Sequence, residues 1–301
     1  MYKQWFDNPD ITKSFPPVYR LYTVYSKFMF NSRSGFVTGG TYVLKKLGKL
    51  TRLLRLRNEA LIQIDGIKAY VDLCDPRMFM VFGELRDDTP EARIMQSLMS
   101  AGDTFIDVGA NHGSYSLVAA GYVGTSGKVL AFEPQPRLAS LIRKSFAVNG
   151  YSNAEVYEIA CSDHSGQAEF YLPENSSGTA GIYRAFSANS AHQKIQVRLE
   201  RFDDLIEWQA LPGRIFLKLD VEGSELAFLR GAEQMLRHRK PHIVLEINPD
   251  SAQAAGYSTE EILSFLISLG YGKFSEVDDW SRVRRLSDAD LTRQRNILVL
   301  A

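Results

Sequence analysis

Residues 104–116, TFIDVGANHGSYS, decide the fold class of this 301-residue chain. Within them an apolar run ends in the acid Asp107, and Gly109 and Gly113 then open a helix-like segment. A second apolar run, KVLAFEP, ends in Glu133, about twenty residues after Gly113. Two strands that each end in an acid, joined by a glycine-containing turn and a helix, are typical of a nucleoside-cofactor site at the switch point of an open α/β sheet.

The residues of this loop bear on which nucleoside cofactor binds. Glycines allow positive φ angles and close approach of the backbone, and a helix start presents free N–H groups to a ligand. Glu133 can accept hydrogen bonds from both ribose hydroxyls of either NAD or S-adenosylmethionine. The glycines follow a GxxxG spacing instead of GxGxxG, and Asp107 would repel a pyrophosphate but suits a cationic ammonium or sulfonium. We therefore favour S-adenosylmethionine over a dinucleotide, and a tight turn without a ligand remains the other alternative.

Three further strand-like runs end in acidic residues: IACSDHSG at 159–166, IFLKLDVEGSE at 215–225 and HIVLEINP at 242–249. The first of these runs places Asp163 where its carboxylate can reach an adenine amino group. The other two place Asp220, Glu222 and Glu246 at the expected mouth of the site.

The strand ends DVG, FEP, SD, KLDVEG and LEI, in this order, resemble the FkbM-type family of S-adenosylmethionine-dependent methyltransferases. KLDVEGSE together with LEINP is the most specific part. The resemblance covers about residues 61–301, with the segment NEALIQIDGIKAYVDL ahead of the core, and leaves the first fifty residues uncovered. It implies hydroxylated acceptors, such as sugar units of glycolipids or polysaccharides, or polyketide hydroxyls. His112 departs from the family pattern, in which this position is more often apolar or small.

The order of elements predicts an α/β fold with the Rossmann-like sheet of class I methyltransferases, mostly parallel with an antiparallel C-terminal strand beside the fifth strand. The pattern predicts strands at 104–108, 128–132, 154–159 and 295–301. It predicts helices at 84–100, 113–121, 135–148, 225–236 and 259–269. Asp65-Gly66, between two alternating runs, adds a hairpin ahead of the core.

We assign residues 61–301 to the S-adenosylmethionine-dependent methyltransferase domain and residues 1–60 to an aromatic and basic helical extension. Residues 41–59 carry lysines and arginines with leucines at helical spacing. This pattern predicts a surface helix packed on the core, which we favour, or a helix at an anionic membrane surface. The aromatic N-terminus is also a candidate homodimer contact, and the long segment 173–194 is predicted to cover the substrate.

Methyl transfer from a sulfonium is an in-line displacement, so the protein mainly positions the acceptor, and a hydroxyl acceptor must also lose its proton. Residues at the ends of the fourth and fifth strands qualify by position for this role, namely Asp220, Glu222 and Glu246. Lys218 points to the same side as Asp220, and its alternative is a core-edge lysine paired with a carboxylate. His112 is a candidate base, with a hydrogen-bonded structural role as its alternative.

The candidate cofactor ligands are Asp107, Gly109, Asn111, Gly113, Glu133 and Asp163. Asp220, Glu246 and Asn248 also offer oxygen ligands of the type that magnesium accepts. The sequence does not decide between the two mechanisms; we favour metal-free chemistry and keep a divalent metal as the alternative.

Composition narrows the class of protein. Apolar residues make up 45% and charged residues 23% of the chain, and the formal net charge is zero, which argues against a nucleic-acid enzyme. Cys74 and Cys161 have no CxxC partner, so neither a disulfide framework nor a zinc site is expected, and a reducing compartment fits. Without a run of about eighteen apolar residues or an N-terminal apolar leader, a cytoplasmic location is expected, with membrane-peripheral contact through 41–59 as the alternative.

Three rival functions remain open. A nicotinamide-dependent oxidoreductase is disfavoured by the GxxxG spacing and by Asp107. A non-catalytic interaction protein that retains the fold is disfavoured by the filled acidic positions. Methylation of a nitrogen is disfavoured because DVEG stands where an NPPY-like segment would be expected.

Overall fold

The computed structural model describes residues 59–301, with gaps at 73–74, 76, 87–88, 174–176 and 184–191. The predictions for residues 1–58, including the basic helix and the dimer contact, therefore lie outside the described residues. The separation of residues 1–60 as an extension stays a prediction.

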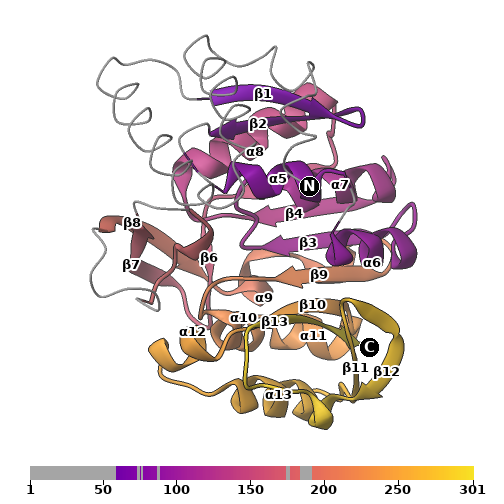
Figure 1. Cartoon of the computed structure of the whole chain (residues 1–301), viewed down its shortest axis with the longest axis vertical. Coiled ribbons are helices and arrows are strands. Elements are labelled where there is room, and N and C mark those ends of the chain that lie inside the picture. Colours follow the sequence, from indigo (N-terminus) through magenta and orange to yellow (C-terminus); the bar gives the residue numbers. More distant parts are fainter. Residues whose placement is uncertain (1–58, 73–74, 76, 87–88, 174–176, 184–191) are drawn as a thin grey trace, which may run out of the picture.

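A mostly parallel eight-stranded sheet forms the core, in the order β12-β11-β13-β10-β9-β3-β4-β5 (Figure 1). Its parallel strands are β3 (Thr104–Val108), β4 (Lys128–Phe132), β5 (Ala154–Tyr157), β9 (Ile215–Leu219) and β10 (His242–Ile247). The antiparallel edge is made by β11 (Lys273–Glu276), β12 (Asp279–Arg285) and β13 (Arg295–Leu300). Since β13 pairs antiparallel with β10, the predicted fold class and the place of the C-terminal strand are confirmed.

Both faces of the sheet are covered by helices, which explains why its central strands are continuous apolar runs. Neighbouring residues of β3 point to opposite sides: Phe105 belongs to one hydrophobic cluster, and Ile106 belongs to the other. The helices are α5 (Met78–Glu84), α6 (Pro90–Leu98), α7 (Ser114–Val123), α8 (Pro136–Asn149), α9 (Phe202–Leu205), α10 (Glu225–Gly231), α11 (Glu233–Arg239), α12 (Pro249–Ala254) and α13 (Thr259–Ser268). None of these helices in the described part of the chain combines the length and the apolarity that a membrane crossing requires.

The predicted hairpin is present as β1 (Glu59–Ile64) and β2 (Ile67–Asp72). Asp65 and Gly66 both have positive φ angles, of 47° and 87°, as a two-residue hairpin turn requires. Strand β2 is fastened to α8, because the Tyr70 N–H donates to Ser145 Oγ over 2.8 Å. The hairpin is therefore part of the domain core and fixes the chain that follows it.

Two predicted helices needed correction. The helix expected over 84–100 begins only at Pro90, as α6, because α5 ends at Glu84, Pro90 can only occupy a first turn and Thr89 Oγ1 caps α6 by accepting from the Ala92 N–H over 3.2 Å. The helix expected over 225–236 ends at Gly231, where an added Cβ would lie 1.9 Å from the Ser162 carbonyl oxygen. Asp203 accepts from two N–H groups at the start of α11, which begins there as a separate helix.

A small second sheet stands beside the carboxyl ends of the parallel strands, toward which the arrows of β3, β4 and β9 point in Figure 1. It consists of β6 (Ala160–Cys161), β7 (Gly166–Pro173) and β8 (His192–Glu200), with the one-turn helix η1 (Ser177–Thr179) after β7. The Tyr171 N–H donates to the Gly181 carbonyl over 2.9 Å, which ties the described part of the 173–194 segment to this sheet. The rest of the predicted substrate cover lies outside the described residues.

Candidate active site

A cleft of about 640 Å³, open to solvent, lies at the carboxyl ends of β3, β4 and β9. Its walls come from the loop after β3, the end of β4, the small sheet and the turn after β9. Five of the residues predicted for the site line it: Gly109, Asn111, Glu133, Asp220 and Glu222.

Gly109 is required by packing between two strand ends. Its φ angle is +85°, and an added Cβ would lie 1.9 Å from the carbonyl oxygen of Asp220. Gly113 begins α7 with a φ angle of +74°, against the side chain of Ile142 on α8. The glycine spacing thus reflects the close fit of the loop against neighbouring elements as well as access for a ligand.

We expect Gly109→Ala to lower the free energy of unfolding by about 3 kcal/mol or more, because both the φ angle and the Asp220 carbonyl oppose a side chain. Gly121→Ala is the matched control, since this helical glycine has nothing within 4 Å of an added Cβ. The control should gain about 0.5–1 kcal/mol. Urea denaturation of both variants measures the difference, and similar stabilities would contradict the prediction.

Glu133 is a buried carboxylate at the inner wall of the cleft. Its oxygens accept the N–H groups of Asn111 and Gln135 over 2.8 and 2.9 Å. Burial raises the pKa of Glu133 to about 7, against the opposing effect of these two hydrogen bonds. Because a carboxylate offers about four acceptor positions, each oxygen can still accept a hydroxyl from the cleft.

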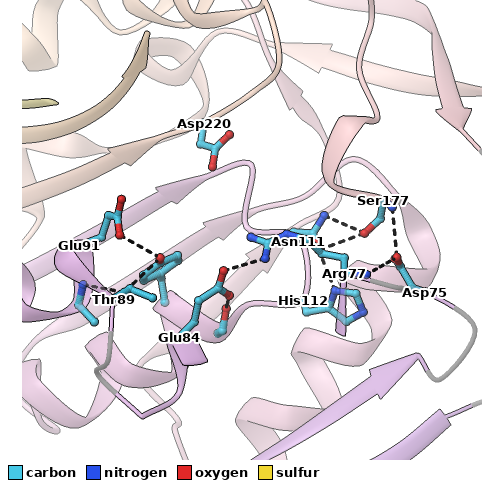
Figure 2. Close-up of polar contacts among 12 residues, drawn as sticks. Asp75, Arg77, Glu84, Thr89, Glu91, Asn111, His112, Ser177 and Asp220 are labelled. Atoms are coloured by element: carbon cyan, nitrogen blue, oxygen red, sulfur yellow. Dashed lines mark hydrogen bonds and ion pairs between the residues drawn. The ribbon is translucent and has the colours of Figure 1, made fainter. Parts of the chain in front are cut away.

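A hydrogen-bond network joins the loop after β3 to the segments around it (Figure 2). Asn111 Nδ2 donates to Ser177 Oγ over 3.0 Å, and the Ser177 N–H donates to Asp75 Oδ1 over 3.2 Å. His112 is 1% exposed and pairs through Nδ1 with Asn111 Oδ1 at 2.7 Å. Burial lowers the pKa of His112. His112 does not line the cleft, so its position suits the orientation of Asn111.

An acidic cluster lies where β9 and β10 end. Oxygen atoms of Asp220, Glu222 and Glu246 all lie within 4.8 Å of one another. Burial and the neighbouring carboxylates raise the pKa of Glu222 to about 8 and that of Glu246 to about 9. Burial also acts to raise the pKa of Asp220, but the Lys218 ammonium outweighs it and the net pKa is lowered. Asp220 is therefore the member that stays ionised.

Lys218 forms an ion pair with Asp220. Its Nζ lies 2.9 Å from Asp220 Oδ2 and 5.2 Å from the centre of the Tyr115 ring. Lys218 is 5% exposed and does not line the cleft. This is the core-edge ion pair that stood as the alternative to a catalytic lysine.

Comparison with known proteins identifies the family of this chain. The family described as "Methyltransferase FkbM domain" matches residues 107–272, which include the loop after β3, Glu133 and the acidic cluster. The chain belongs to this family. It is accordingly a methyltransferase, as the strand-end motifs indicated.

Relatives of the FkbM methyltransferase described here are distant. The hexuronic acid methyltransferase AglP of Haloferax volcanii is 23% identical over 257 residues, which span 82% of this chain and 99% of AglP. The crystal structure of an FkbM methyltransferase from Methylobacillus flagellatus is 16% identical with a TM-score of 0.41, and the match covers 75% of this chain and 54% of that one. This chain thus matches about half the length of that structure. TYW2 of M. jannaschii, solved in complex with AdoMet, is 10% identical with a TM-score of 0.42, and the match covers 81% of this chain and 85% of that one.

Three predicted cofactor ligands of this FkbM methyltransferase do not line the cleft, namely Asp107, Gly113 and Asp163. Asp107 is buried beneath the loop and accepts from Ser116 Oγ over 2.6 Å. Asp163 is exposed and pairs with His164 Nδ1 at 2.7 Å. Their roles as cofactor ligands stay predictions.

Sequence reasoning missed Arg77 and Asp75, which lie beside the cleft. Arg77 lines it and pairs with Glu84 at 2.8 Å, and its N–H donates to Asp75 Oδ1 over 3.0 Å. Both residues follow the hairpin, ahead of the motif-bearing core. No spacing in the sequence marks them, because the fastening of β2 to α8 determines where this segment lies.

Proposed function

We propose that this FkbM methyltransferase transfers a methyl group from S-adenosylmethionine to a hydroxyl oxygen of a glycosyl acceptor, free or lipid-linked. One observation carries the proposal: a single cleft connects the buried acceptor Glu133 with the carboxylates Asp220 and Glu222. AglP, whose name places its activity on hexuronic acid, supports a sugar acceptor. The zero net charge supports a sugar over a nucleic acid.

The residues present fit the cofactor. Glu133 has free acceptor positions facing the cleft, and Gly109 and Asn111 bring backbone to the same wall. Apolar side chains of Ile159 and Phe170 line another wall, where a flat base can pack. The cofactor supplies an activated methyl group on a sulfonium.

The chain's own residues position the acceptor. Lys218 keeps Asp220 ionised, so Asp220 can accept a hydrogen bond from an acceptor hydroxyl. Asp220 would take up the hydroxyl proton, while the bound cofactor would give up its methyl group through cleavage of the carbon–sulfur bond and leave as the neutral thioether S-adenosylhomocysteine.

Isothermal titration with S-adenosylhomocysteine, and with NAD as a control, tests the cofactor. Micromolar binding of S-adenosylhomocysteine alone is the expected result, whereas binding of NAD alone would favour an oxidoreductase. Binding of neither ligand would favour an interaction protein. Transfer of labelled methyl groups to hexuronic acid and to neutral sugars then tests the acceptor.

The affinity for S-adenosylhomocysteine should fall as the pH drops below about 7. Ribose hydroxyls need an ionised acceptor, and the pKa of Glu133 is raised to about 7 by burial. One linked proton weakens binding by up to about tenfold per pH unit, and the affinity should level off above pH 7. Glu133→Gln should remove this dependence, and a wild-type affinity that is flat between pH 5 and 8 would contradict the prediction.

A further inference from the structure

The acidic cluster of Asp220, Glu222 and Glu246 contains an oxygen that the protein leaves without a donor. Glu246 is 8% exposed, and its Oε1 accepts from Gln294 Nε2 over 2.8 Å. Its Oε2 is buried and has no hydrogen-bond partner among the described residues. A carboxylate oxygen of Glu246 lies within 4.8 Å of oxygens of Asp220 and Glu222, which are acceptors themselves. A buried acceptor without a donor is costly, which points to a missing cation or proton.

The charged groups around the cluster have partners of their own. Lys218 pairs with Asp220, and Arg77 pairs with Glu84. Glu225 is satisfied by the N–H groups of Val221 and Gly223 and by the Tyr257 hydroxyl.

We propose that Asp220, Glu222 and Glu246 bind one divalent cation at the acceptor end of the cleft. Carboxylate oxygens without histidine or cysteine select hard cations such as Mg²⁺, Mn²⁺ or Ca²⁺. Oxygens that share one cation lie at most about twice the metal–oxygen distance apart, or about 4.2 Å for Mg²⁺ and about 5 Å for Ca²⁺. The 4.8 Å limit observed here therefore admits Ca²⁺ directly and Mg²⁺ or Mn²⁺ after a small side-chain movement.

The proposed cation would be accessible from the cleft. Asp220 and Glu222 line the cleft, whereas Glu246 is buried behind them. An acceptor oxygen can occupy the side that faces the cleft, where a cation orients it and makes its proton easier to remove. This role for the cation rests on the proposed function, whereas binding of the cation does not. The proposal departs from the metal-free chemistry that the sequence favoured, because the structure brings Glu222 to Asp220 and Glu246.

Titration of the 301-residue chain with Mn²⁺, followed by electron paramagnetic resonance and by calorimetry, tests the site. We expect one Mn²⁺ per chain, and at least tenfold weaker binding in both Glu246→Gln and Glu222→Gln. Glu158→Gln, an exposed carboxylate paired with Arg143, is the matched control and should bind as the wild type does. Thermal denaturation of each variant shows whether it is folded, and Ca²⁺ competition tests the ion class.

Two results would overturn the proposal: no Mn²⁺ or Ca²⁺ binding by the wild type at millimolar concentration, or binding that neither glutamine variant weakens. The second result would place the ion elsewhere on the chain. Calorimetry with S-adenosylhomocysteine on the same samples separates this proposal from the function proposed above. Mn²⁺ binding without S-adenosylhomocysteine binding would sustain the cation site and overturn the cofactor assignment.

Discussion

Glu133→Ala should weaken the binding of S-adenosylhomocysteine by about 100-fold or more. Hydrogen bonds to a charged acceptor contribute about 1.5–3 kcal/mol each, and the variant loses those to two ribose hydroxyls. It also leaves the N–H groups of Asn111 and Gln135 without their acceptor, which loosens the loop that carries the cofactor. Isothermal titration measures the change.

Glu155→Ala is the matched control for this variant. Glu155 lies on β5, next to β4, and pairs with Lys128 at the surface. It should leave the affinity for S-adenosylhomocysteine unchanged. An affinity of Glu133→Ala within threefold of the wild type would remove the basis of the cofactor assignment.

Asp220→Asn should lower kcat by about 10²–10³-fold and change the affinity for S-adenosylhomocysteine by less than threefold. The amide keeps the size of the side chain but cannot take up the proton of an acceptor or provide a charged hydrogen-bond acceptor. Its cost in stability should be about 1–3 kcal/mol, because Lys218 is buried and loses its nearest partner. Single-turnover kinetics and urea denaturation measure the two effects separately.

The double variant Asp220→Asn/Lys218→Met separates catalysis from folding. Removal of the buried ammonium should restore part of the stability that Asp220→Asn loses, since the unpaired charge of Lys218 is gone while buried Asp107 loses a neighbouring cation. The loss of kcat should remain. Recovery of kcat together with stability would show that Asp220 acts only through the fold, and an equal loss of kcat and affinity would make it a cofactor ligand.

Sequence reasoning placed the central strands well for a physical reason. β3, β4 and β9 are buried on both faces, so each is a short apolar run, and each is followed at its carboxyl end by a polar residue or loop. The same reasoning did not find β11 and β12. Strand β12 is largely exposed, so it lacks the apolar pattern that marks a strand.

The predicted site residues likewise divide into those that line the cleft and those that do not. Glu133 and Asp220 follow directly from strands whose ends must meet at one edge of a parallel sheet, and both line the cleft. Asp107 is the last but one residue of β3, and its side chain lies under the loop in a hydrogen bond with Ser116. Its proximity in sequence to Gly109 therefore did not put it in the cleft.

The sequence by itself determined the parallel strands of the sheet, the family and the acidic strand ends, because these depend on local apolar runs and on short motifs. Only the tertiary structure decided which acidic side chains lie close together. Glu222 reaches Glu246 because the turn after β9 adopts a positive φ angle of 51° at Glu222 and is held by Glu225. Arg77 reaches the cleft because the hairpin packs on α8. Such contacts join residues far apart in the chain, and no local pattern records the packing that brings them together.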